Sequence, residues 1–582
     1  MKTARLALCQ INPVVGDLNG NVKKIIAHIE KAGEYSPDII VFPELAVTGY
    51  PPEDLLLKPQ FIDDTLAALN EIRESTGDAV VVTGFVDRTD DIYNAAAILH
   101  NGRLVDVYHK MHLPFYGVFD EFRYFQAGSR YTVYELENCL FGINICEDIW
   151  YAGGPTAVQA LSGAEFIINI NASPYQIGKG EFRKRMLSTR AYDNSVIIAY
   201  LNTVGGQDEL VFDGQSFIVD QNGDVFAEGK QFEEDMVIAD LDLDAVFTRR
   251  LREPTRRQQV FDLGCESVEK ITIAGKRGGR KEQNILHSEV LSPCKPFTME
   301  EEVYRALVLG TGDYVHKNGF ADVCIGLSGG IDSALVAAIA ADAVGADNVT
   351  GVFMPSPYTS RESAEDTREL AGNLGIKLIE IPIVSVFDSY LDALKPPFEN
   401  KPADITEENL QARIRGNLLM ALSNKFRWLV LTTGNKSEMS VGYATLYGDM
   451  AGGFAVIKDV SKTLVYLLCK WKNLEEGRAV IPERVLIKAP SAELKHDQKD
   501  TDTLPPYDVL DPILKKYIEE DKSFDEIVTL NPYCPEENTK RVIRMVDFSE
   551  YKRRQSPPGI KITPRAFGRD RRFPITNRYR SW

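Results

Sequence analysis

The sequence predicts an α/β protein with two folded units, and three observations carry this prediction. In the first half, short apolar runs alternate with stretches of helical periodicity, which is typical of strands buried on both faces of a layered sheet. In the second half, an apolar run at residues 323–327 enters a glycine-rich turn and then an alanine-rich stretch, the order of strand, tight turn and helix. Between the halves, residues 267–296 lack apolar periodicity and contain a cluster of glycine, lysine and arginine, which predicts a linker. A chain of 582 residues is also too long for one hydrophobic core.

The expected elements follow from where the apolar runs begin and end. In the first unit the predicted strands are residues 5–10, 39–42, 79–84, 95–99, 140–145, 166–170 and 196–200. Helical patterns lie between several of them, for example at residues 21–32 and 61–75. This alternation persists to about Asp262. The second unit begins with a helical pattern near Met299, and a helix is predicted after the glycine-rich turn, at residues 334–346.

Composition and charge exclude several classes of protein. The chain is 44% hydrophobic and 26% charged, as in ordinary soluble domains, and its net charge of −18 argues against general nucleic-acid binding. No apolar run approaches the ~18 residues that a membrane-spanning helix needs, and the amino terminus becomes polar too early for a signal peptide. Eight cysteines are scattered without a C-x-x-C pair, which favours reduced thiols over disulfides or zinc ligands. We therefore expect a cytoplasmic protein that binds neither membranes nor nucleic acid.

The glycine-rich turn has the composition of a phosphate-binding loop. It comprises Gly326, Leu327, Ser328, Gly329, Gly330, Ile331, Asp332 and Ser333. Glycine lets backbone N–H groups approach an anion, the start of the following helix favours negative charge, and the two serines add hydroxyl donors. Asp332 can bind a Mg²⁺ ion that a nucleotide carries. The string is not a Walker A motif, and a simple tight turn between strand and helix is the alternative interpretation.

A second apolar run, at residues 429–432, ends in a similar way. Thr433 follows it and can reach a nucleotide, and Glu438 can bind Mg²⁺ together with Asp332. Taken alone this string reads equally well as a capped turn, and the pairing with the glycine-rich loop favours the nucleotide. Lys462 and Ser491 lie in two further polar strings downstream.

These motifs resemble known nucleotide-using enzymes. The Ser-Gly-Gly-x-Asp-Ser string resembles the pyrophosphate loop of N-type ATP pyrophosphatases, and from about Met299 onward the chain resembles the NAD synthetase family. The resemblance implies a Rossmann-like, doubly wound parallel sheet of the adenine nucleotide α-hydrolase type. It also implies that the glycine-rich loop, Thr433, Lys462 and Ser491 contact ATP, that Asn409, Glu438 and Lys552 lie at the deamido-NAD or metal site, and that Asp332 and Glu438 hold Mg²⁺.

The end of the chain is basic although the protein is acidic. From Tyr551 onward it has ten lysines or arginines and one acidic residue, Asp570. Local positive charge suits a substrate with two phosphates and a carboxylate, and a basic surface tail is the alternative. Leu446 and Gly453 stand where the short, ammonia-only members of the NAD synthetase family have a charged Lys and Asp, and Tyr551 replaces a His. The string at residues 445–450 resembles the long, glutamine-dependent branch of that family instead.

Three residues of the first unit form a possible nucleophile set. Glu44 and Cys146 each follow a predicted strand, where ligand sites of α/β folds gather, and Lys110 lies between them in the sequence. A carboxylate can take the proton of a thiol, and an ammonium group can stabilise the oxyanion that forms when the thiolate attacks a carbonyl. Each residue alone is weak evidence, because a single cysteine at a strand end is more often a buried apolar group.

In this order and context, the three residues resemble the nitrilase (carbon–nitrogen hydrolase) superfamily over residues 1–265. The resemblance implies an αββα sandwich with Glu44 as the base, Lys110 as the oxyanion stabiliser and Cys146 as the nucleophile. Glutaminase domains of this type also hold the amino acid through polar residues, and Tyr116, Ser173 and Lys179 match these positions.

Together the resemblances imply an enzyme that joins ammonia to a carboxylate. The expected units are residues 1–265, a nitrilase-like glutaminase; 266–298, a linker; and 299–582, the ATP-using unit. The expected substrates are L-glutamine, ATP and deamido-NAD, and the expected cofactor is Mg²⁺. A homo-oligomer is expected because nitrilase-like domains commonly assemble. A sheltered path would carry ammonia between the sites, since free ammonia is mostly ammonium at neutral pH and is then not nucleophilic.

Other functions must be weighed against this one. A plain nitrilase or amidase with a regulatory nucleotide-binding half would hydrolyse amides without releasing pyrophosphate. Other glutamine amidotransferases fit less well, because GMP synthetase uses an unrelated glutaminase and asparagine synthetase needs an amino-terminal cysteine, where this chain has Lys2 and Thr3 after Met1. A non-catalytic scaffold is disfavoured by the intact Glu44, Lys110, Cys146 and Asp332.

Overall fold

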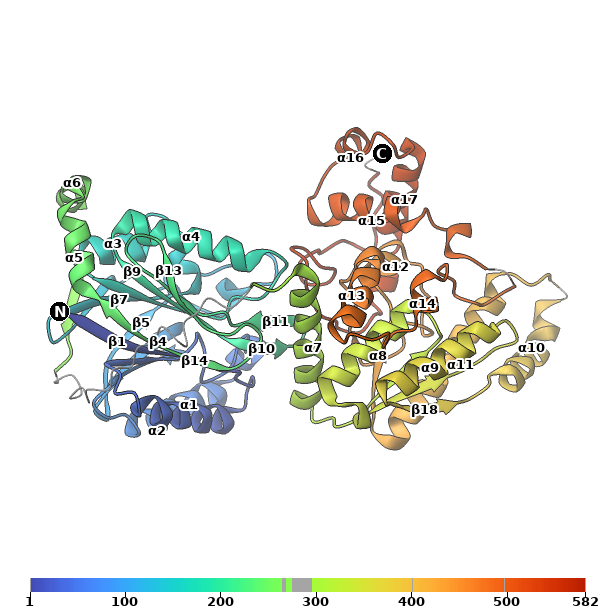
Figure 1. Cartoon of the computed structure of the whole chain (residues 1–582), viewed down its shortest axis with the longest axis horizontal. Helices are drawn as coiled ribbons and strands as arrows, with labels where there is room; N and C mark the ends of the chain where they lie inside the picture. The colour runs from blue at the N-terminus through green and yellow to red at the C-terminus, as the bar shows by residue number, and fades with distance from the viewer. Residues whose placement is uncertain (1, 264–267, 275–295, 400, 497, 581–582) are drawn as a thin grey trace. The chain divides into compact units, whose positions relative to one another are not determined.

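The computed structural model describes residues 2–263, 268–274, 296–399, 401–496 and 498–580 (Figure 1). The chain divides into two compact units. The first comprises Met1–Gln207 and Val211–Pro296, and the second comprises Asp208–Leu210 and Phe297–Trp582.

Two sheets form the centre of the first unit. The six-stranded sheet has the order β14-β1-β2-β3-β4-β5, and the seven-stranded sheet has the order β13-β12-β9-β8-β7-β6-β15. The strands of the first sheet are β1 (Thr3–Gln10), β2 (Ile39–Val41), β3 (Val80–Arg88), β4 (Ile92–His100), β5 (Arg103–His109) and β14 (Asp235–Asp242). Those of the second are β6 (Thr132–Leu136), β7 (Cys139–Ile145), β8 (Phe166–Asn171), β9 (Ile197–Asn202), β12 (Phe217–Val219), β13 (Val225–Glu228) and β15 (Glu269–Thr272). Two short strands, β10 (Val204–Gln207) and β11 (Leu210–Asp213), pair with each other.

Helices cover the outer face of each sheet, so the unit has four layers. Helices α1 (Leu18–Gly33) and α2 (Pro59–Glu74) lie on one side, and α3 (Pro155–Leu161) and α4 (Lys179–Asn194) lie on the other (Figure 1). Strand β1 shows how the sequence produces this arrangement, because successive side chains of a strand point to opposite faces. Leu6 and Leu8 belong to the core between the sheets, whereas Ala7 and Cys9 belong to the core beneath α1 and α2. The expected αββα sandwich is confirmed.

All seven strands and both helices named from the sequence of this unit are present, with ends that differ by a few residues. The strands that the sequence did not reveal are short or carry exposed polar residues. Strand β5, for example, begins with exposed Arg103 and Leu104 at the edge of its sheet. Within the expected linker, the described strand β15 pairs in parallel with β6. The greater part of that linker, residues 275–295, lies outside the described residues.

The second unit is built on a parallel sheet of five strands in the order β18-β17-β16-β19-β20. The strands are β16 (Val323–Leu327), β17 (Val349–Phe353), β18 (Lys377–Glu380), β19 (Leu429–Thr432) and β20 (Phe454–Ala455). The chain proceeds outward from β16 to β18 and then returns to place β19 on the other side of β16. The order therefore reverses between β16 and β19, and the crevice at the carboxyl ends of two such strands is where open α/β sheets bind ligands. The expected doubly wound sheet is confirmed.

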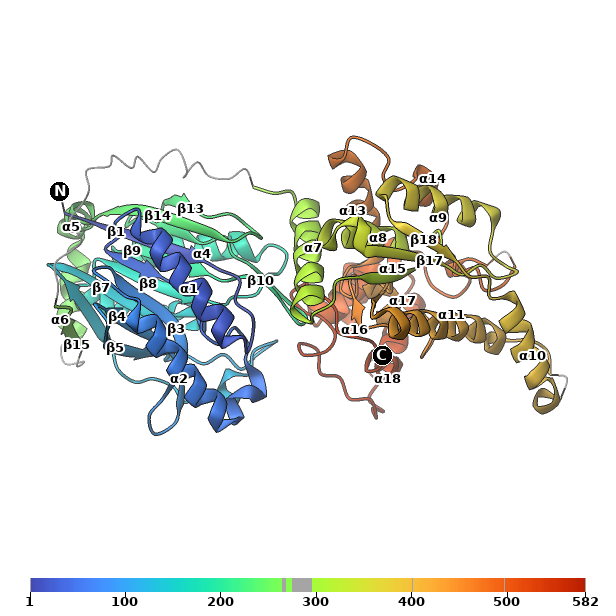
Figure 2. The same cartoon turned by 90° about the horizontal axis from the view of Figure 1, so that it is seen from below.

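Helices lie on both faces of this sheet. Helix α8 (Ile331–Val344) packs against β16, α7 (Met299–Lys317) and α13 (Lys462–Glu475), and Figure 2 shows the three helices together. The alanine-rich sequence of α8 suits this position, because a helix that is apolar all round must be buried on all sides. On the opposite face, α10 (Val384–Phe398) and α11 (Ile405–Phe426) enclose a core with Cys324, Val352 and Val430.

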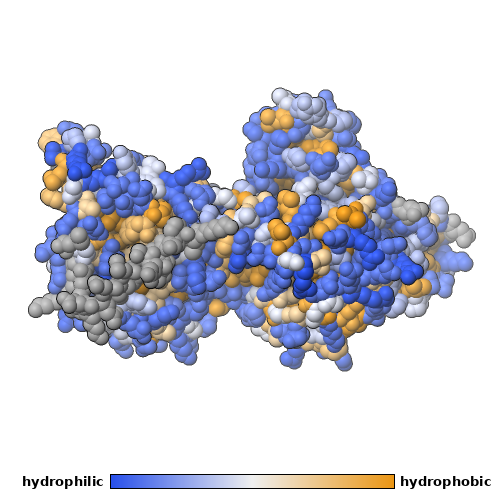
Figure 3. All heavy atoms as spheres, viewed as in Figure 1, coloured by the Kyte–Doolittle hydropathy of each residue, from blue (hydrophilic) through white to orange (hydrophobic). Residues whose placement is uncertain are grey.

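Three further helices of the second unit form a cluster with a core of its own. Helices α15 (Tyr507–Leu514), α16 (Phe524–Leu530) and α17 (Glu536–Phe548) contribute Leu510, Ile527 and Val542 to that core. Across the described ranges no helix combines the length and the apolarity that a membrane crossing requires. The face drawn in Figure 3 agrees with this result, because apolar residues there are interspersed among hydrophilic ones.

Candidate active sites

Cys146 lies at the carboxyl end of β7, in a sharply turned backbone. Its φ is +43°, a left-handed value that costs ~1–3 kcal/mol for a residue with a side chain. The turn is held by Asp148, whose Oδ2 accepts hydrogen bonds from the N–H of Ile145 at 3.0 Å and from the hydroxyl of Tyr108 at 2.8 Å. Asp148 Oδ1 accepts the N–H of His112 at 2.9 Å, which ties the segment after Lys110 to the turn.

Lys110 lies at the centre of a buried cluster of carboxylates. Its Nζ donates to Glu44 Oε1 at 2.6 Å and to both carboxylate oxygens of Glu121, at 2.9 and 2.8 Å. The side chains of Lys110 and Glu44 are fully buried. Glu44 Oε2 accepts the N–H of Ala172 at 2.8 Å, and Asn94 Nδ2 donates to Glu44 Oε1 at 2.8 Å. Both carboxylate oxygens of Glu44 thus have fixed partners, so the carboxylate has one orientation.

The charges of this cluster act on the thiol. Burial raises the pKa of Cys146 well above its ordinary value, the negative charge of Glu44 adds to the shift, and Lys110 opposes it. Burial alone would lower the pKa of Lys110, but Glu121 and Glu44 outweigh it and the pKa of Lys110 is raised. The thiol therefore needs a base before it can act as a nucleophile, whereas the ammonium keeps its charge. Glu44, Lys110 and Cys146, which the sequence singled out, are brought together here.

Of the three residues expected to hold glutamine, Tyr116 and Ser173 lie on loops beside this cluster, and Lys179 begins α4. The hydroxyl of Tyr116 donates to Glu147, directly after Cys146, at 2.9 and 3.1 Å. Ser173 follows Ala172, the residue whose N–H binds Glu44, and its own N–H donates to Asn202. Lys179 Nζ donates to the carbonyl of Pro174 at 3.0 Å. Burial raises the pKa of Glu147, and the charge of Lys179 opposes a small part of that shift.

Sequence reasoning did not identify Glu121, Asn94 or Glu147. Glu121 lies in a short 3-10 turn (Glu121–Arg123) and is 5% exposed, and the hydroxyl of Tyr50 also donates to it, at 2.9 Å. Asn94 is the one polar residue of the buried run from Tyr93 to Leu99. A polar residue in such an apolar run was the signal by which the sequence could have identified it.

The second unit contains a cavity of about 290 Å³ at the switch point of its sheet. All eight residues of the glycine-rich loop line it, and so do Thr433, Glu438, Lys462 and Ser491. Gly329 has a φ of +75°, and a Cβ atom there would lie 2.5 Å from the carbonyl oxygen of Ser363, so both the conformation and the space require glycine. The ATP-contacting residues expected from the sequence therefore share one cavity.

Lys462 joins the two acidic residues of this cavity. Its Nζ makes ion pairs with Asp332 and, at 3.3 Å, with Glu438 Oε1. The three come from different elements, since Asp332 begins α8, Lys462 begins α13 and Glu438 lies on α12 (Lys436–Val441). Burial raises the pKa of Glu438 to about 8, while Lys462 opposes that shift. Burial would lower the pKa of Lys462, but the carboxylates of Asp332 and Glu438 outweigh it and raise the pKa.

Two expected residues lie outside the lining of the cavity. Asn409 Oδ1 accepts the hydroxyl of Thr445 at 2.8 Å, and Lys552 Nζ donates to the carbonyls of Gly442 and Ala444 at 2.7 and 2.8 Å. Both side chains therefore contact the segment 442–445, part of which borders the cavity. Conversely, the cavity is lined by Arg415 and Lys488, which the sequence did not reveal.

Asp332 and Glu438 suit a cation that arrives with a nucleotide. Both carboxylates reach one ammonium group, so they converge on a single point. Within the described ranges no three His, Cys, Asp or Glu side chains form a metal-holding group. Two carboxylates plus phosphate oxygens are a normal ligand set for Mg²⁺, which seldom has an all-protein cage. The residues present thus fit a nucleotide-borne Mg²⁺ ion and no stand-alone metal centre.

Comparisons with known proteins agree with this geometry. The carbon–nitrogen hydrolase family matches residues 5–250, and the NAD synthase family matches residues 303–556. A glutamine-dependent NAD(+) synthetase of Thermotoga maritima is 50% identical over 100% of both chains, and one of Aquifex aeolicus is 46% identical over 99% of both. The solved structure of the Acinetobacter baumannii glutamine-dependent NAD+ synthetase in complex with ADP is 43% identical and has a TM-score of 0.75, and the match covers 99% of each chain. Full-length relatives at this identity and the two family matches show that the chain belongs to the glutamine-dependent NAD(+) synthetase family.

Proposed function

We propose that the chain makes NAD(+) from deamido-NAD(+), ATP and L-glutamine, releasing AMP, pyrophosphate and L-glutamate. The observation that carries this proposal is the 50% identity to a glutamine-dependent NAD(+) synthetase over the whole of both chains. An identity that spans both units disfavours a plain amidase with a regulatory nucleotide-binding half, because such a protein would need only the first site.

In the first unit, Glu44 takes the proton of Cys146 and the thiolate attacks the side-chain amide carbon of glutamine. Lys110 stabilises the oxyanion, because its charge is fixed by Glu44 and Glu121. Ammonia then leaves with a proton returned by Glu44, and a thioester remains. Water activated by Glu44 hydrolyses the thioester to glutamate. Tyr116, Ser173 and Lys179 are assigned to the binding of the amino acid, in which Tyr116 acts beside Glu147.

In the second unit, a carboxylate oxygen of deamido-NAD(+) attacks the α-phosphorus of ATP, and pyrophosphate leaves. The glycine-rich loop, Thr433 and Ser491 line the cavity from several sides and are assigned to the nucleotide. Lys462 neutralises the charge that develops on the phosphoryl oxygens. Ammonia then attacks the acyl carbon, and AMP is the leaving group. Asn409 and Lys552 are assigned to deamido-NAD(+) through their contacts with the segment 442–445.

Asp332 and Glu438 would hold Mg²⁺, and the convergence of their carboxylates on Lys462 Nζ supports this assignment. Such an ion, when bound, adds positive charge to the pyrophosphate leaving group. The unit boundaries of 1–265, 266–298 and 299–582 are part of the same proposal. A homo-oligomer is also part of the proposal, and light scattering would measure its mass. The cytoplasmic location stays a prediction.

The proposal is tested by the stoichiometry of the reaction. Native protein is incubated with deamido-NAD(+), ATP, Mg²⁺ and glutamine labelled with ¹⁵N in its amide. The expected result is one NAD(+), AMP, pyrophosphate and glutamate per turnover, with the label in the nicotinamide. Glutamate formation that is indifferent to ATP, without pyrophosphate, would instead establish the plain amidase.

The magnesium requirement is expected to depend on pH. Because burial raises the pKa of Glu438 to about 8, its carboxyl group holds a proton at neutral pH that a cation must displace. Between about pH 7 and pH 8, the Mg²⁺ concentration for half-maximal NAD(+) formation is expected to fall roughly fivefold, because the protonated fraction of Glu438 falls from about nine-tenths to about one-half. The measurement is a Mg²⁺ titration with ammonium adjusted to a constant free-ammonia concentration. Glu438→Gln, which has no such proton, should lose the trend, and a native half-saturation that does not change with pH would contradict the prediction.

A further inference from the structure

Asn435 makes two side-chain hydrogen bonds that link the acidic residues of the cavity. Its Nδ2 donates to Asp332 Oδ1 at 2.9 Å, and its Oδ1 accepts the N–H of Glu438 at 3.0 Å. The side chain is fully buried and does not line the cavity. One amide therefore bridges the start of α8 and the start of α12, between two residues whose carboxylates meet at Lys462.

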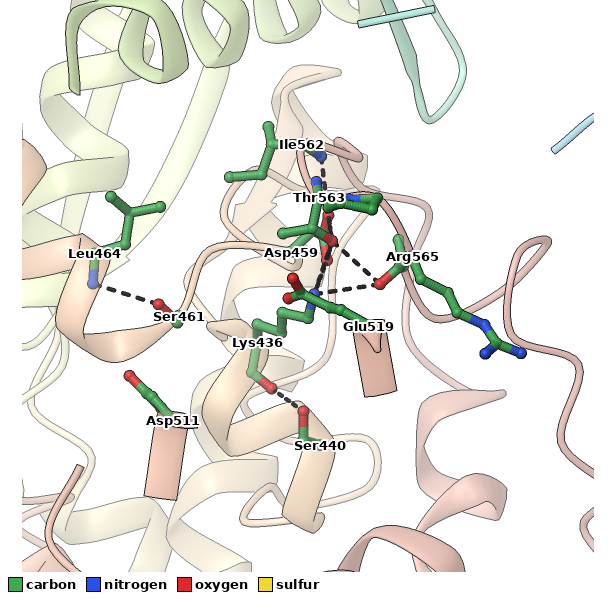
Figure 4. Close-up of polar contacts among 12 residues, drawn as sticks. Lys436, Ser440, Asp459, Ser461, Leu464, Asp511, Glu519, Ile562, Thr563 and Arg565 are labelled. Atoms are coloured by element: carbon green, nitrogen blue, oxygen red, sulfur yellow. Dashed lines mark hydrogen bonds and ion pairs between the residues drawn. The ribbon is translucent and has the colours of Figure 1, made fainter. Parts of the chain in front are cut away.

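Helix α12 is anchored from its other side, independently of this amide. Figure 4 shows Lys436 directed into a cluster of acceptors on segments far apart in the sequence. Its Nζ donates to Glu519 Oε1 and Thr563 Oγ1, each at 2.7 Å, and forms an ion pair with Asp459 Oδ1 at 2.8 Å. Asp459 Oδ2 in turn accepts the N–H of Thr563 at 2.8 Å.

The next residue adds a second anchor, toward the helix that carries Lys462. Ser437 Oγ accepts the N–H of Lys462 at 2.9 Å and donates to Asp511 Oδ1. Asp511 Oδ2 accepts the N–H of Thr463 at 2.9 Å. The backbone of α12 is thus fixed at Lys436 and Ser437. Holding the helix in place therefore does not explain why Asn435, the N-cap residue of α12, is an asparagine.

A comparison of asparagine with other N-cap residues shows what its side chain adds. Asparagine, aspartate and serine cap helices about equally well, because each offers an oxygen to the N–H groups of the first turn. Among these residues only asparagine also offers an N–H donor. That donor holds Asp332 Oδ1, which leaves the other carboxylate oxygen of Asp332 to pair with Lys462.

We propose that Asn435 is a positioning residue of the adenylating site, which sets the orientation of Asp332 relative to Glu438 and thereby the affinity of the site for the nucleotide-borne cation. This role rests on the proposed assignment of Mg²⁺ to Asp332 and Glu438. Partners that orient metal ligands in this way typically contribute 10- to 100-fold to metal affinity or activity.

The test uses two variants that keep a cap acceptor and lose the amide donor. Asn435→Ser does so without adding charge, and Asn435→Asp keeps the shape but places a carboxylate oxygen against Asp332. The Kd for Mn²⁺ in the presence of a non-hydrolysable ATP analogue, measured by electron paramagnetic resonance, is expected to rise about tenfold in the serine variant. With an ammonium salt as nitrogen source, the Mg²⁺ concentration for half-maximal NAD(+) formation is expected to rise by the same factor. The aspartate variant should lose activity at least as severely, and the KM for deamido-NAD(+) should not change in either.

Ser523→Ala is the matched control, because Ser523 caps α16 through the N–H of Glu526 and lies in the helical cluster away from the cavity. It should lower the melting temperature without altering the Mg²⁺ titration. Native-like titrations for both Asn435 variants would overturn the proposal, as would an equal shift in Ser523→Ala. If the native protein makes NAD(+) without any magnesium requirement, the assignment of Mg²⁺ to Asp332 and Glu438 fails. This outcome can be distinguished from failure of the Asn435 proposal, because it is seen in the native protein without any variant.

Discussion

Replacing Cys146 with alanine is expected to abolish NAD(+) formation from glutamine and to leave formation from an ammonium salt intact. The thiol is the only group of its cluster that can form a covalent bond to the amide carbon, since Glu44 and Lys110 are paired with each other. Loss of a nucleophile from such a unit typically costs far more than 10³-fold, so the expected loss is at least about 10³-fold. A φ of +43° is equally unfavourable for alanine and for cysteine, so the substitution adds no backbone strain.

The measurement compares NAD(+) formation from the two nitrogen sources at saturating ATP and deamido-NAD(+). Cys139→Ala is the control, because Cys139 is another buried thiol, at the opposite end of the same strand β7. It should retain both reactions. Equal loss of both reactions in Cys146→Ala would show that this residue supports the fold of the unit more than its chemistry. Unchanged use of glutamine would remove Cys146 from the mechanism.

Replacing Lys462 with methionine is expected to abolish NAD(+) formation from both nitrogen sources. The ammonium is buried between Asp332 and Glu438 in the nucleotide cavity, and the substitution leaves both carboxylates without their shared cation. Removal of one preorganised charge that stabilises a transition state costs roughly 10²- to 10³-fold in rate. Pyrophosphate release should fall in parallel, because the step affected is the adenylation and not the amidation.

Lys472→Met is the matched control on the same helix. Lys472 is also a buried lysine of α13, and it pairs with Asp342 and Glu476 at 2.7 Å, outside the lining of the cavity. It should reduce thermal stability and leave the kcat for NAD(+) formation near the native value. If both lysine variants lose activity to the same degree, the loss at Lys462 reflects a damaged α13. If Lys462→Met retains activity, another cation must act on the phosphates.

The sequence was sufficient to predict the parts of the protein in which the residues that act together are close in the sequence. The apolar runs predicted the inner strands, because a strand buried on both faces is apolar at most of its positions. The loop from Gly326 to Ser333 could be recognised because its strand, glycines, serines and aspartate are contiguous and form one sequence motif. The same holds for Thr433, which follows β19 directly, and for Glu438 on the next helix, α12.

The residues that escaped prediction are those whose partners are distant in the sequence. Glu121 becomes a partner of Lys110 only because a loop folds back, and in the sequence it is one of two adjacent acidic residues in an aromatic-rich stretch. Arg415 lies near the middle of α11, where an arginine ordinarily faces solvent, and its place in the cavity follows from the packing of that helix on the sheet. The roles of Asn435 and Lys436 could not be seen either, since their partners Asp332, Glu519 and Thr563 lie 83 to 127 positions away.

The pairing of β1 with β14 also determines when the first unit can be completed during synthesis. Thr3 to Gln10 form an antiparallel ladder with Asp235–Asp242, although the two strands are separated by almost the whole unit. A ribosome that adds about 5–20 residues per second needs on the order of 10–50 s to make the second strand after the first has emerged. Throughout that interval one edge of β1 has open backbone donors and acceptors, which other chains can pair with. The nascent glutaminase unit is therefore a natural client for chaperones that cover strand edges, and slower translation should increase its aggregation.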